Sequence, residues 1–261
     1  MDLGLKGKVA LVSGGSSGIG RATAVALANE GVRVVVVGRN EKELQNTVAK
    51  IQGAGSEGFA IVADMSKLEN VKRVAAEAGS HFGRIDILVN SAGSAMGGPF
   101  LELSDEAWQS AMQLKFFGAV RLCHEVVPHM IQAGGGRIIN IIGGAAKEPT
   151  ATFLPGSTTN AAFRNFNKGL ALALKKHNIL VNAISPGSTR TPRVVRLMEQ
   201  DAGLRGVSIE EIEREREAAF VGGHMTTPEE IAAVAVFLAS KQVVTLTGAE
   251  IDVNGGSSHG L

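Results

Sequence analysis

The stretch Ser13-Gly14-Gly15-Ser16-Ser17-Gly18-Ile19-Gly20 lies between a short apolar run, Val9–Val12, and an alanine-rich segment, Arg21–Asn29. In a turn between a strand and a helix, Gly14 permits a tight bend, Gly18 lets the backbone approach a pyrophosphate, and Gly20 allows the helix to pack closely on the strand. The helix that follows offers unpaired N–H groups and the positive end of its dipole to an anion. The stretch therefore predicts a phosphate-binding turn.

The alternation of apolar run and helical segment continues along the chain. Near-continuous apolar strands separated by helices are typical of a parallel sheet that is buried on both faces. With right-handed crossovers, this pattern predicts one α/β domain: a three-layer, doubly wound parallel sheet of about seven strands, the Rossmann fold. The expected strands are Val9–Val12, Val32–Val37, Phe59–Val62, Ile85–Val89, Ile138–Ile142, Ile179–Ile184 and Ala249–Val253, and the expected helices are Arg21–Asn29, Glu41–Ile51, Ser104–Met130, Ala161–Leu174 and Pro228–Ala239.

Two features modify this pattern. Pro128 is expected to bend or end the long helix that begins at Ser104. The segment Pro192–Gly223 is rich in charge and flanked by glycines. It is interpreted either as a solvated helix with ion pairs between successive turns or as a mobile lid over a cleft, and these two interpretations are compatible. The chain, residues 1–261, is thus expected to be a single domain with a lid-like insertion at about 192–223.

The composition excludes several classes of function. The 26 basic and 25 acidic side chains nearly cancel, which argues against a nucleic-acid or a membrane partner. No apolar run is long enough to span a bilayer, and no histidine or cysteine cluster has the spacing of a metal site. The single cysteine, Cys123, cannot form an internal disulfide, so a cytoplasmic location is expected.

The end of the second expected strand bears on which dinucleotide binds. Sites that prefer NAD place a carboxylate there, about twenty residues after the turn, to hold the ribose 2′-hydroxyl. No acidic residue lies between Val32 and Asn40, and Arg39, with Ser16, would instead meet a 2′-phosphate. The sequence therefore favours NADP(H) over NAD(H) as cofactor. The alternative is that Arg39 is simply an exposed charge after a strand.

Further motifs occur in a characteristic order. Asn90-Ser91-Ala92-Gly93 resembles N-N-A-G, Val181–Gly187 resembles V-N-x-x-x-P-G, and Ser13–Gly20 resembles T-G-x-x-x-G-I-G. From about Lys8 to Gly256 the chain thus resembles the short-chain dehydrogenase/reductase family. The resemblance implies an oxidoreductase of a small carbonyl or alcohol, and a homo-oligomer, dimer or tetramer, built on helices Ser104–Met130 and Ser157–Lys176. The cofactor contacts that it implies are Gly14, Ser16, Ser17, Gly18, Ile19, Gly20, Arg39, Asp64, Asn90, Ala92, Gly93, Pro186, Gly187, Thr189 and Thr191.

The resemblance fails at the family's catalytic Asn-Ser-Tyr-Lys set. In that set the tyrosine moves the substrate proton, the lysine holds the nicotinamide ribose, the serine orients the substrate and the asparagine holds a water. The corresponding positions here are Lys115, Gly143 or Gly144, Gly156 and Asn160, and the chain contains no tyrosine. Positioned acid–base catalysis contributes roughly 10²–10⁴-fold, so carbonyl reduction by the family's route is expected to be very slow.

Lys115 and Asn160 are therefore the candidate catalytic residues. A partly buried lysine with a lowered pKa could donate a proton or attract an anionic substrate, and the alternative is a structural ion pair, for instance with Glu148. The function expected is an NADP(H)-binding oxidoreductase with a degenerate active site, acting on an unknown small substrate or by atypical chemistry such as isomerisation or dehydration. The alternatives are a catalytically inactive NADP(H)-binding sensor or assembly protein, or a subunit whose partner supplies the chemistry.

Overall fold

The computed structural model describes residues 2–257, and its strands form one seven-stranded sheet in the order β3-β2-β1-β4-β5-β6-β7. All paired strands run parallel. The predicted Rossmann fold is thus confirmed, and each predicted strand lies within two residues of the observed one. The strands are β1 (Val9–Ser13), β2 (Arg33–Gly38), β3 (Gly58–Val62), β4 (Ile87–Asn90), β5 (Gly136–Ile141), β6 (Ile179–Pro186) and β7 (Glu250–Val253).

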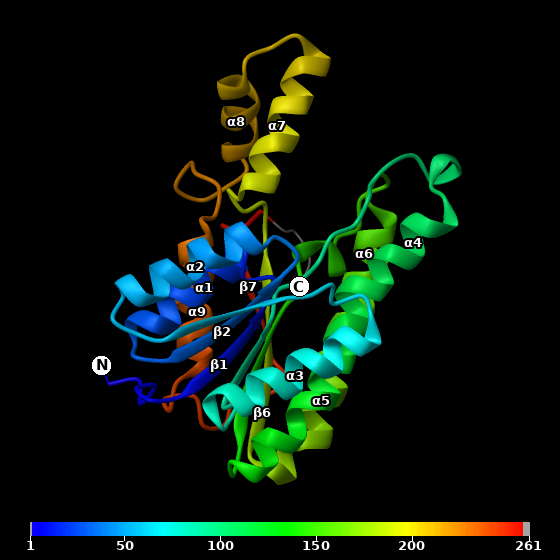
Figure 1. The fold of residues 1–261 in the computed structure, drawn as a ribbon. Helices are drawn as coiled ribbons and strands as arrows, with labels where there is room; N and C mark the ends of the chain where they lie inside the picture. Colours follow the sequence, from blue (N-terminus) through cyan, green and yellow to red (C-terminus); the bar gives the residue numbers. More distant parts are fainter. Residues whose placement is uncertain (1, 258–261) are drawn as a thin grey trace.

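Helices cover both faces of the sheet (Figure 1). On one face lie α1 (Gly18–Asn29), α2 (Glu41–Gly53) and α9 (Pro228–Ala239); on the other lie α3 (Leu68–Phe82), α5 (Gly118–Gln132) and α6 (Leu154–Leu174). The sequence explains the two layers, because successive residues of a strand point to opposite faces. In β2, Val34 and Val36 pack in the core under α1 and α2, whereas Val35 and Val37 pack in the core under α3 and α5.

The long helix predicted from Ser104 to Met130 is interrupted. It consists of α4 (Asp105–Ala111), a π-helical turn (Met112–Phe117) and α5, and Ser104 caps its start by accepting from the Ala107 N–H at 3.3 Å. Pro128 does not end it, since α5 continues to Gln132. The π turn had no signal in the apolar pattern, and single π turns often occur at functional sites.

Helix α3 was not predicted. Its buried side comprises Val71, Val74, Ala75, Ala78 and Gly79, which have helical spacing but little bulk. Lys67 at its start gives no side-chain cap, so the usual start signal is absent. The helix is stabilised by its packing against α5 and the sheet, and this tertiary contribution cannot be inferred from the segment alone.

The segment 192–223 forms two helices, α7 (Pro192–Arg205) and α8 (Ile209–Glu217), which stand beyond the carboxyl edge of the sheet (Figure 1). They enclose a small apolar cluster that includes Met198 and Ile212. Arg205 binds both carboxylate oxygens of Glu215 at 2.7 Å, which accounts for part of the charge in this segment. No helix within residues 2–257 is long and apolar enough to cross a bilayer.

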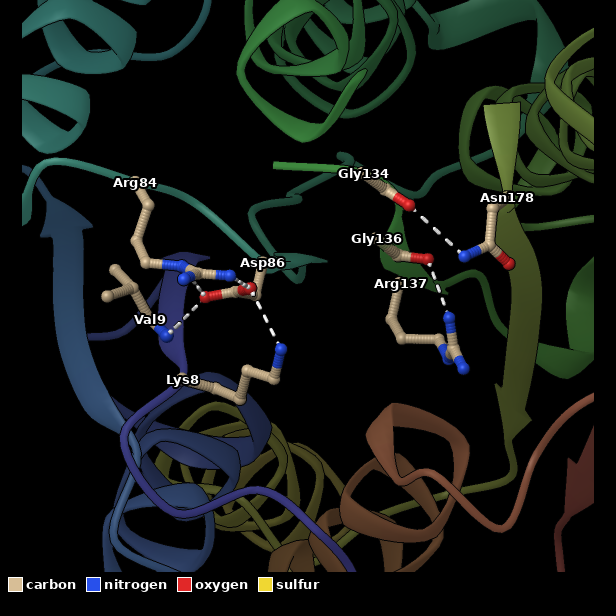
Figure 2. Close-up of polar contacts among 8 residues, drawn as sticks. All are labelled: Lys8, Val9, Arg84, Asp86, Gly134, Gly136, Arg137 and Asn178. Carbon is tan, nitrogen blue, oxygen red and sulfur yellow. Dashed lines mark hydrogen bonds and ion pairs between the residues drawn. The ribbon is translucent and has the colours of Figure 1, made fainter. Parts of the chain in front are cut away.

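The opposite, amino-terminal edge of the sheet is closed by polar contacts (Figure 2). The Asp86 carboxylate accepts from the Val9 N–H at 3.0 Å, from Arg84 Nε at 2.8 Å and from Lys8 Nζ at 3.3 Å. Burial disfavours the charged carboxylate, but these donors outweigh it and hold the pKa of Asp86 below its ordinary value. The network joins the start of β1 to the segment before β4, and the cavity beside it, of about 220 Å³, is much smaller than the one at the carboxyl edge.

Candidate functional site

A cavity of about 790 Å³ lies at the carboxyl ends of the strands. Its walls come from the turn after β1, the segments after β4, β5 and β6, and the first turns of α7. The sheet order reverses between β1 and β4, and in open α/β sheets ligands bind in the crevice at such a reversal. The position of the cavity therefore follows from the topology.

The turn after β1 is shaped by close contacts. Gly14 has a φ of +71°, and a Cβ atom there would lie 2.8 Å from the backbone nitrogen of Ala92. A Cβ atom at Gly20 would overlap with the Gly14 carbonyl group, so both positions require glycine. Helix α1 begins at Gly18 without a side-chain cap from Ser17 and without an acidic residue in its first turn. Its first N–H groups can therefore donate hydrogen bonds to an anion in the cavity.

Most of the predicted cofactor residues lie together around this cavity. Thr191, at the start of α7, approaches the turn, because a Cβ atom at Gly18 would lie 3.0 Å from its Cγ2. The side chain of Thr191 also accepts from the Val194 N–H at 3.4 Å and so caps α7. The predicted cofactor residues that line the cavity are Gly14, Ser16, Ser17, Gly18, Ile19, Gly20, Arg39, Ala92, Gly93, Pro186, Gly187, Thr189 and Thr191.

Two predicted cofactor residues, Asp64 and Asn90, are not among the residues that line the cavity. Asp64 accepts from the N–H and the hydroxyl of Ser66, at 3.0 and 2.8 Å. The Ser66 N–H, opposed by burial, is the main reason that the pKa of Asp64 lies below its ordinary value, and the charge of Arg39 contributes less. Asp64 thus orders the segment that follows β3.

Asn90 belongs to a buried ladder of amides. Its Nδ2 donates to Asn140 Oδ1 at 2.8 Å, and Asn140 Nδ2 donates to Asn167 Oδ1 at 2.9 Å. Asn90 also donates to Cys123 Sγ at 3.4 Å, and burial raises the pKa of that thiol to about 12. The ladder joins β4, β5 and α6 beneath the cavity. An asparagine that ends an otherwise apolar strand was the only signal for it, and sequence reasoning missed Asn140 and Asn167.

Arg39 faces both the cavity and an adjoining hollow of about 640 Å³, which Ser16, Asn40, Glu41 and Lys42 also line. The Arg39 side chain is exposed, and among residues 2–257 it forms no ion pair. The hollow thus brings two cationic side chains and one hydroxyl, beside the Glu41 carboxylate, to the edge of the phosphate-binding turn. This donor set suits a phosphate group.

Lys115 lies on the π turn and extends into the cavity floor. Its Nζ donates to the Ile142 carbonyl, and a Cβ atom at Gly93 would lie 3.0 Å from its Cδ. Burial lowers the pKa of Lys115 to about 8, and the positive charge of Arg193 adds to this effect. No ion pair of Lys115 occurs within the described part of the chain, so the alternative pairing with Glu148 is not observed.

Asn160 and Gly143 lie side by side at the cavity wall. Asn160 is 4% exposed, and its Oδ1 is buried and has no hydrogen-bond partner within residues 2–257. Gly143 has a φ of +129°, and a Cβ atom there would lie 3.1 Å from Asn160 Nδ2. A side chain at position 143 would therefore be strained and crowded. Asn160 thus lines the cavity with an amide oxygen that lacks a donor within the described residues.

Gly156 does not line the cavity, because the ring of Phe153 covers it. A Cβ atom at Gly156 would overlap with Cε1 and Cζ of that ring, and its distance to Cε2 would be 2.8 Å. Phe153 itself lines the cavity. The space next to Gly156 is thus filled by an aromatic side chain from one turn earlier. Arg193 and Arg196 also line the cavity, and sequence reasoning singled out neither of them.

Comparisons with known proteins agree with this geometry. Residues 8–202 match the family model described as short chain dehydrogenase. The chain is 38% identical over 248 residues to the short-chain reductase protein NovJ of Streptomyces niveus, which covers 95% of this chain and 93% of that protein.

Two solved structures are similar over nearly the whole chain. L-Sorbose reductase from Gluconobacter frateurii, complexed with NADPH and L-sorbose, has a TM-score of 0.96 and 33% identity and covers 100% of both chains. A variant of the actinorhodin polyketide ketoreductase with NADPH has a TM-score of 0.92 and 31% identity and covers 97% of each chain. The sheet, the turn after β1 and these similarities together establish that the chain belongs to the short-chain dehydrogenase/reductase family.

Proposed function

We propose that this chain is an NADP(H)-dependent oxidoreductase of a small carbonyl or alcohol, with an active site that lacks the family's usual Asn-Ser-Tyr-Lys set. The observation that carries the proposal is Lys115, a lysine with a pKa of about 8 on the floor of the cavity. NADPH is bound in both of the similar solved structures, which supports the choice of cofactor.

The residues of the cavity fit NADP(H). The uncapped start of α1 and the glycines of the turn would hold the pyrophosphate, and Arg39 with Ser16 and Lys42 would hold the 2′-phosphate. Asn160, whose buried Oδ1 lacks a donor, would accept from a hydroxyl of the ribose or of the substrate. When bound, the cofactor would supply or accept the hydride.

Lys115 would donate the proton to the substrate oxygen or accept it from that oxygen. At neutral pH a lysine with a pKa of about 8 is mostly an ammonium, which can donate to a carbonyl oxygen as the hydride arrives. In the oxidative direction the neutral amine would take the hydroxyl proton. One donor site of Nζ is directed to the Ile142 carbonyl, which fixes the orientation of the ammonium and leaves its other N–H bonds for the substrate.

Two further parts of the proposal concern the domain and its assembly. The insertion at 192–223 would act as a lid, because Arg193, Val194 and Leu197 of α7 already form part of the cavity wall. A homo-oligomer through the α5 and α6 layer is favoured by exposed apolar side chains there, among them Ile131 at 42% and Leu172 at 62% exposed. The mass of the protein in solution, measured by light scattering, tests whether it forms this homo-oligomer.

A catalytically inactive NADP(H)-binding sensor or assembly protein is the second candidate. The observation that favours it is the covered Gly156: an aromatic ring fills the space beside the position that corresponds to the family's tyrosine. In this case the cavity would bind the dinucleotide and the protein would not turn over any carbonyl compound.

The test combines nucleotide titration with a panel of carbonyl compounds. NADPH is expected to bind more tightly than NADH, and turnover is expected to fall by roughly 10²–10⁴-fold in Lys115→Met, which keeps the side-chain length that packs on Gly93. Lys72→Met, at an exposed position on α3, is the control and is expected to leave turnover unchanged. Binding without any turnover would support the sensor, and failure to bind either nucleotide would refute both candidates.

A further inference from the structure

The substrate end of the cavity carries two positive charges. Lys115 extends from the π turn under Gly93, and Arg193 extends from the first turn of α7. Arg193 Nη2 donates to the Ala95 carbonyl at 2.9 Å. Both cations therefore contact the same segment after β4, Lys115 at Gly93 and Arg193 at Ala95.

Among the described residues, neither cation has a carboxylate partner. The ion pairs formed within residues 2–257 include neither Lys115 nor Arg193. The charge of Arg193 instead acts on Lys115 and contributes to its lowered pKa. Two like charges that share one cavity repel each other, and an anion bound between them would remove that repulsion and gain charge-assisted hydrogen bonds.

The other described residues that line the cavity do not supply enough negative charge to balance Lys115 and Arg193. Within residues 2–257, the cavity lining contains four cationic side chains, Arg39, Lys115, Arg193 and Arg196, against a single carboxylate, Glu148, which has an interaction partner of its own. A single carboxylate cannot balance four cations. The site as a whole therefore attracts negatively charged ligands.

The phosphates of the cofactor would balance the other end of the cavity. Arg39 follows β2, whereas Lys115 contacts the segments after β4 and β5, which are two and three positions further along the sheet. With roughly 4.8 Å between neighbouring strands, this corresponds to about 10–14 Å across the sheet. A 2′-phosphate held by Arg39 is thus too far away to pair with Lys115.

We infer that the substrate carries a carboxylate, which binds between Lys115 and Arg193, and that the site therefore takes an oxo acid or the corresponding hydroxy acid. The inference rests on the proposed function and adds the substrate class to it. Leu114, Ile142 and Phe153 also line the cavity, and Ile142 is in contact with Lys115, so an apolar body of the substrate fits there. Because Lys115 would also give the proton, the carboxylate lies close to the carbonyl group, as in a 2-oxo acid.

A matched pair of probes tests this inference: phenylglyoxylate and its neutral methyl ester. Their binding is measured by calorimetry with and without saturating NADP⁺, and their turnover is followed by NADPH absorbance. The variants are Arg193→Gln, which keeps an amide donor for the Ala95 carbonyl, and Arg214→Gln as control. Arg214 is exposed on α8 and does not line the cavity.

The acid is expected to bind at least about tenfold more tightly than the ester, and Arg193→Gln is expected to abolish this difference. The control should preserve it. Equal binding of acid and ester by the unmodified protein, or no binding of either, would overturn the inference. It would also be overturned if Arg193→Gln weakened NADPH binding and left the ratio of acid to ester unchanged, because Arg193 would then serve the cofactor.

The binding measurements separate this inference from the proposed function. If the acid binds preferentially and is not turned over, the substrate class is supported and the oxidoreductase proposal fails. If neutral carbonyl compounds are reduced as readily as their acids, the oxidoreductase proposal holds and the substrate class is refuted.

Discussion

A methyl group added at Gly156 should compete with the ring of Phe153. Gly156 lies in the first turn of α6 with an ordinary φ, so the backbone itself accepts alanine. In an open helical position, glycine to alanine stabilises a protein by about 0.5–1 kcal/mol. At Gly156, however, the new Cβ would overlap with two ring atoms and lie 2.8 Å from a third, whereas ordinary contacts begin at about 3.4 Å.

The ring must therefore move, and overpacking of this kind costs about 1–3 kcal/mol. Gly156→Ala is expected to lower the free energy of unfolding by about 1–2 kcal/mol, the packing cost less the gain of alanine in a helix. In a Phe153→Ala background the same change should stabilise the protein. The matched control is Gly169→Ala on the same helix, where nothing lies within 4 Å of the added Cβ, and this variant should be stabilised.

Urea denaturation followed by circular dichroism measures all four variants of the double-mutant cycle and the control. A coupling energy of about 2 kcal/mol between positions 153 and 156 is expected. If Gly156→Ala stabilises the protein as much as Gly169→Ala does, the ring does not fill this space, and the observation that favours the inactive sensor or assembly protein is wrong.

Three other outcomes are expected. Lys115 loses its proton near pH 8, so kcat/KM for carbonyl reduction should fall as the pH rises through about 8, and Lys115→Arg should move this fall to higher pH. Arg39→Asp should weaken NADPH binding by about 10–100-fold and reduce the preference over NADH, measured by fluorescence titration. Asn140→Leu removes one hydrogen bond from each of two buried amides, Asn90 and Asn167, and should lower the free energy of unfolding by about 2–4 kcal/mol in urea, whereas the same change at exposed Asn165 should have little effect.

The sheet was predictable because its signal is local. Each strand is a short β-branched run, and a strand buried on both faces needs little more than that. The turn after β1 was predictable for a similar reason, since Gly14 and Gly20 are demanded by contacts between neighbouring elements. Helix α3 was missed because its buried side is made of small residues and it is stabilised by α5, which comes 36 residues later in the chain.

The candidate site was predictable only in part. The resemblance pointed to positions 115, 143, 156 and 160, and the structure brings Lys115, Gly143 and Asn160 to one cavity. No pattern in the sequence indicates that the ring of Phe153 covers Gly156 or that Arg193 lies near Lys115. These contacts join loops and helices that are far apart in the chain, and their positions depend on how the whole sheet edge is assembled.

The covered Gly156 also restricts the order in which sequence changes can accumulate here. A bulky residue that arises first at position 156 enters an occupied space and is disfavoured at once. If Phe153 is replaced first by something small, the protein passes through a form with a void, which is costly in a different way. On either path the first single substitution lowers the stability of the protein. The pair of Gly156 and Phe153 is therefore difficult to replace one residue at a time.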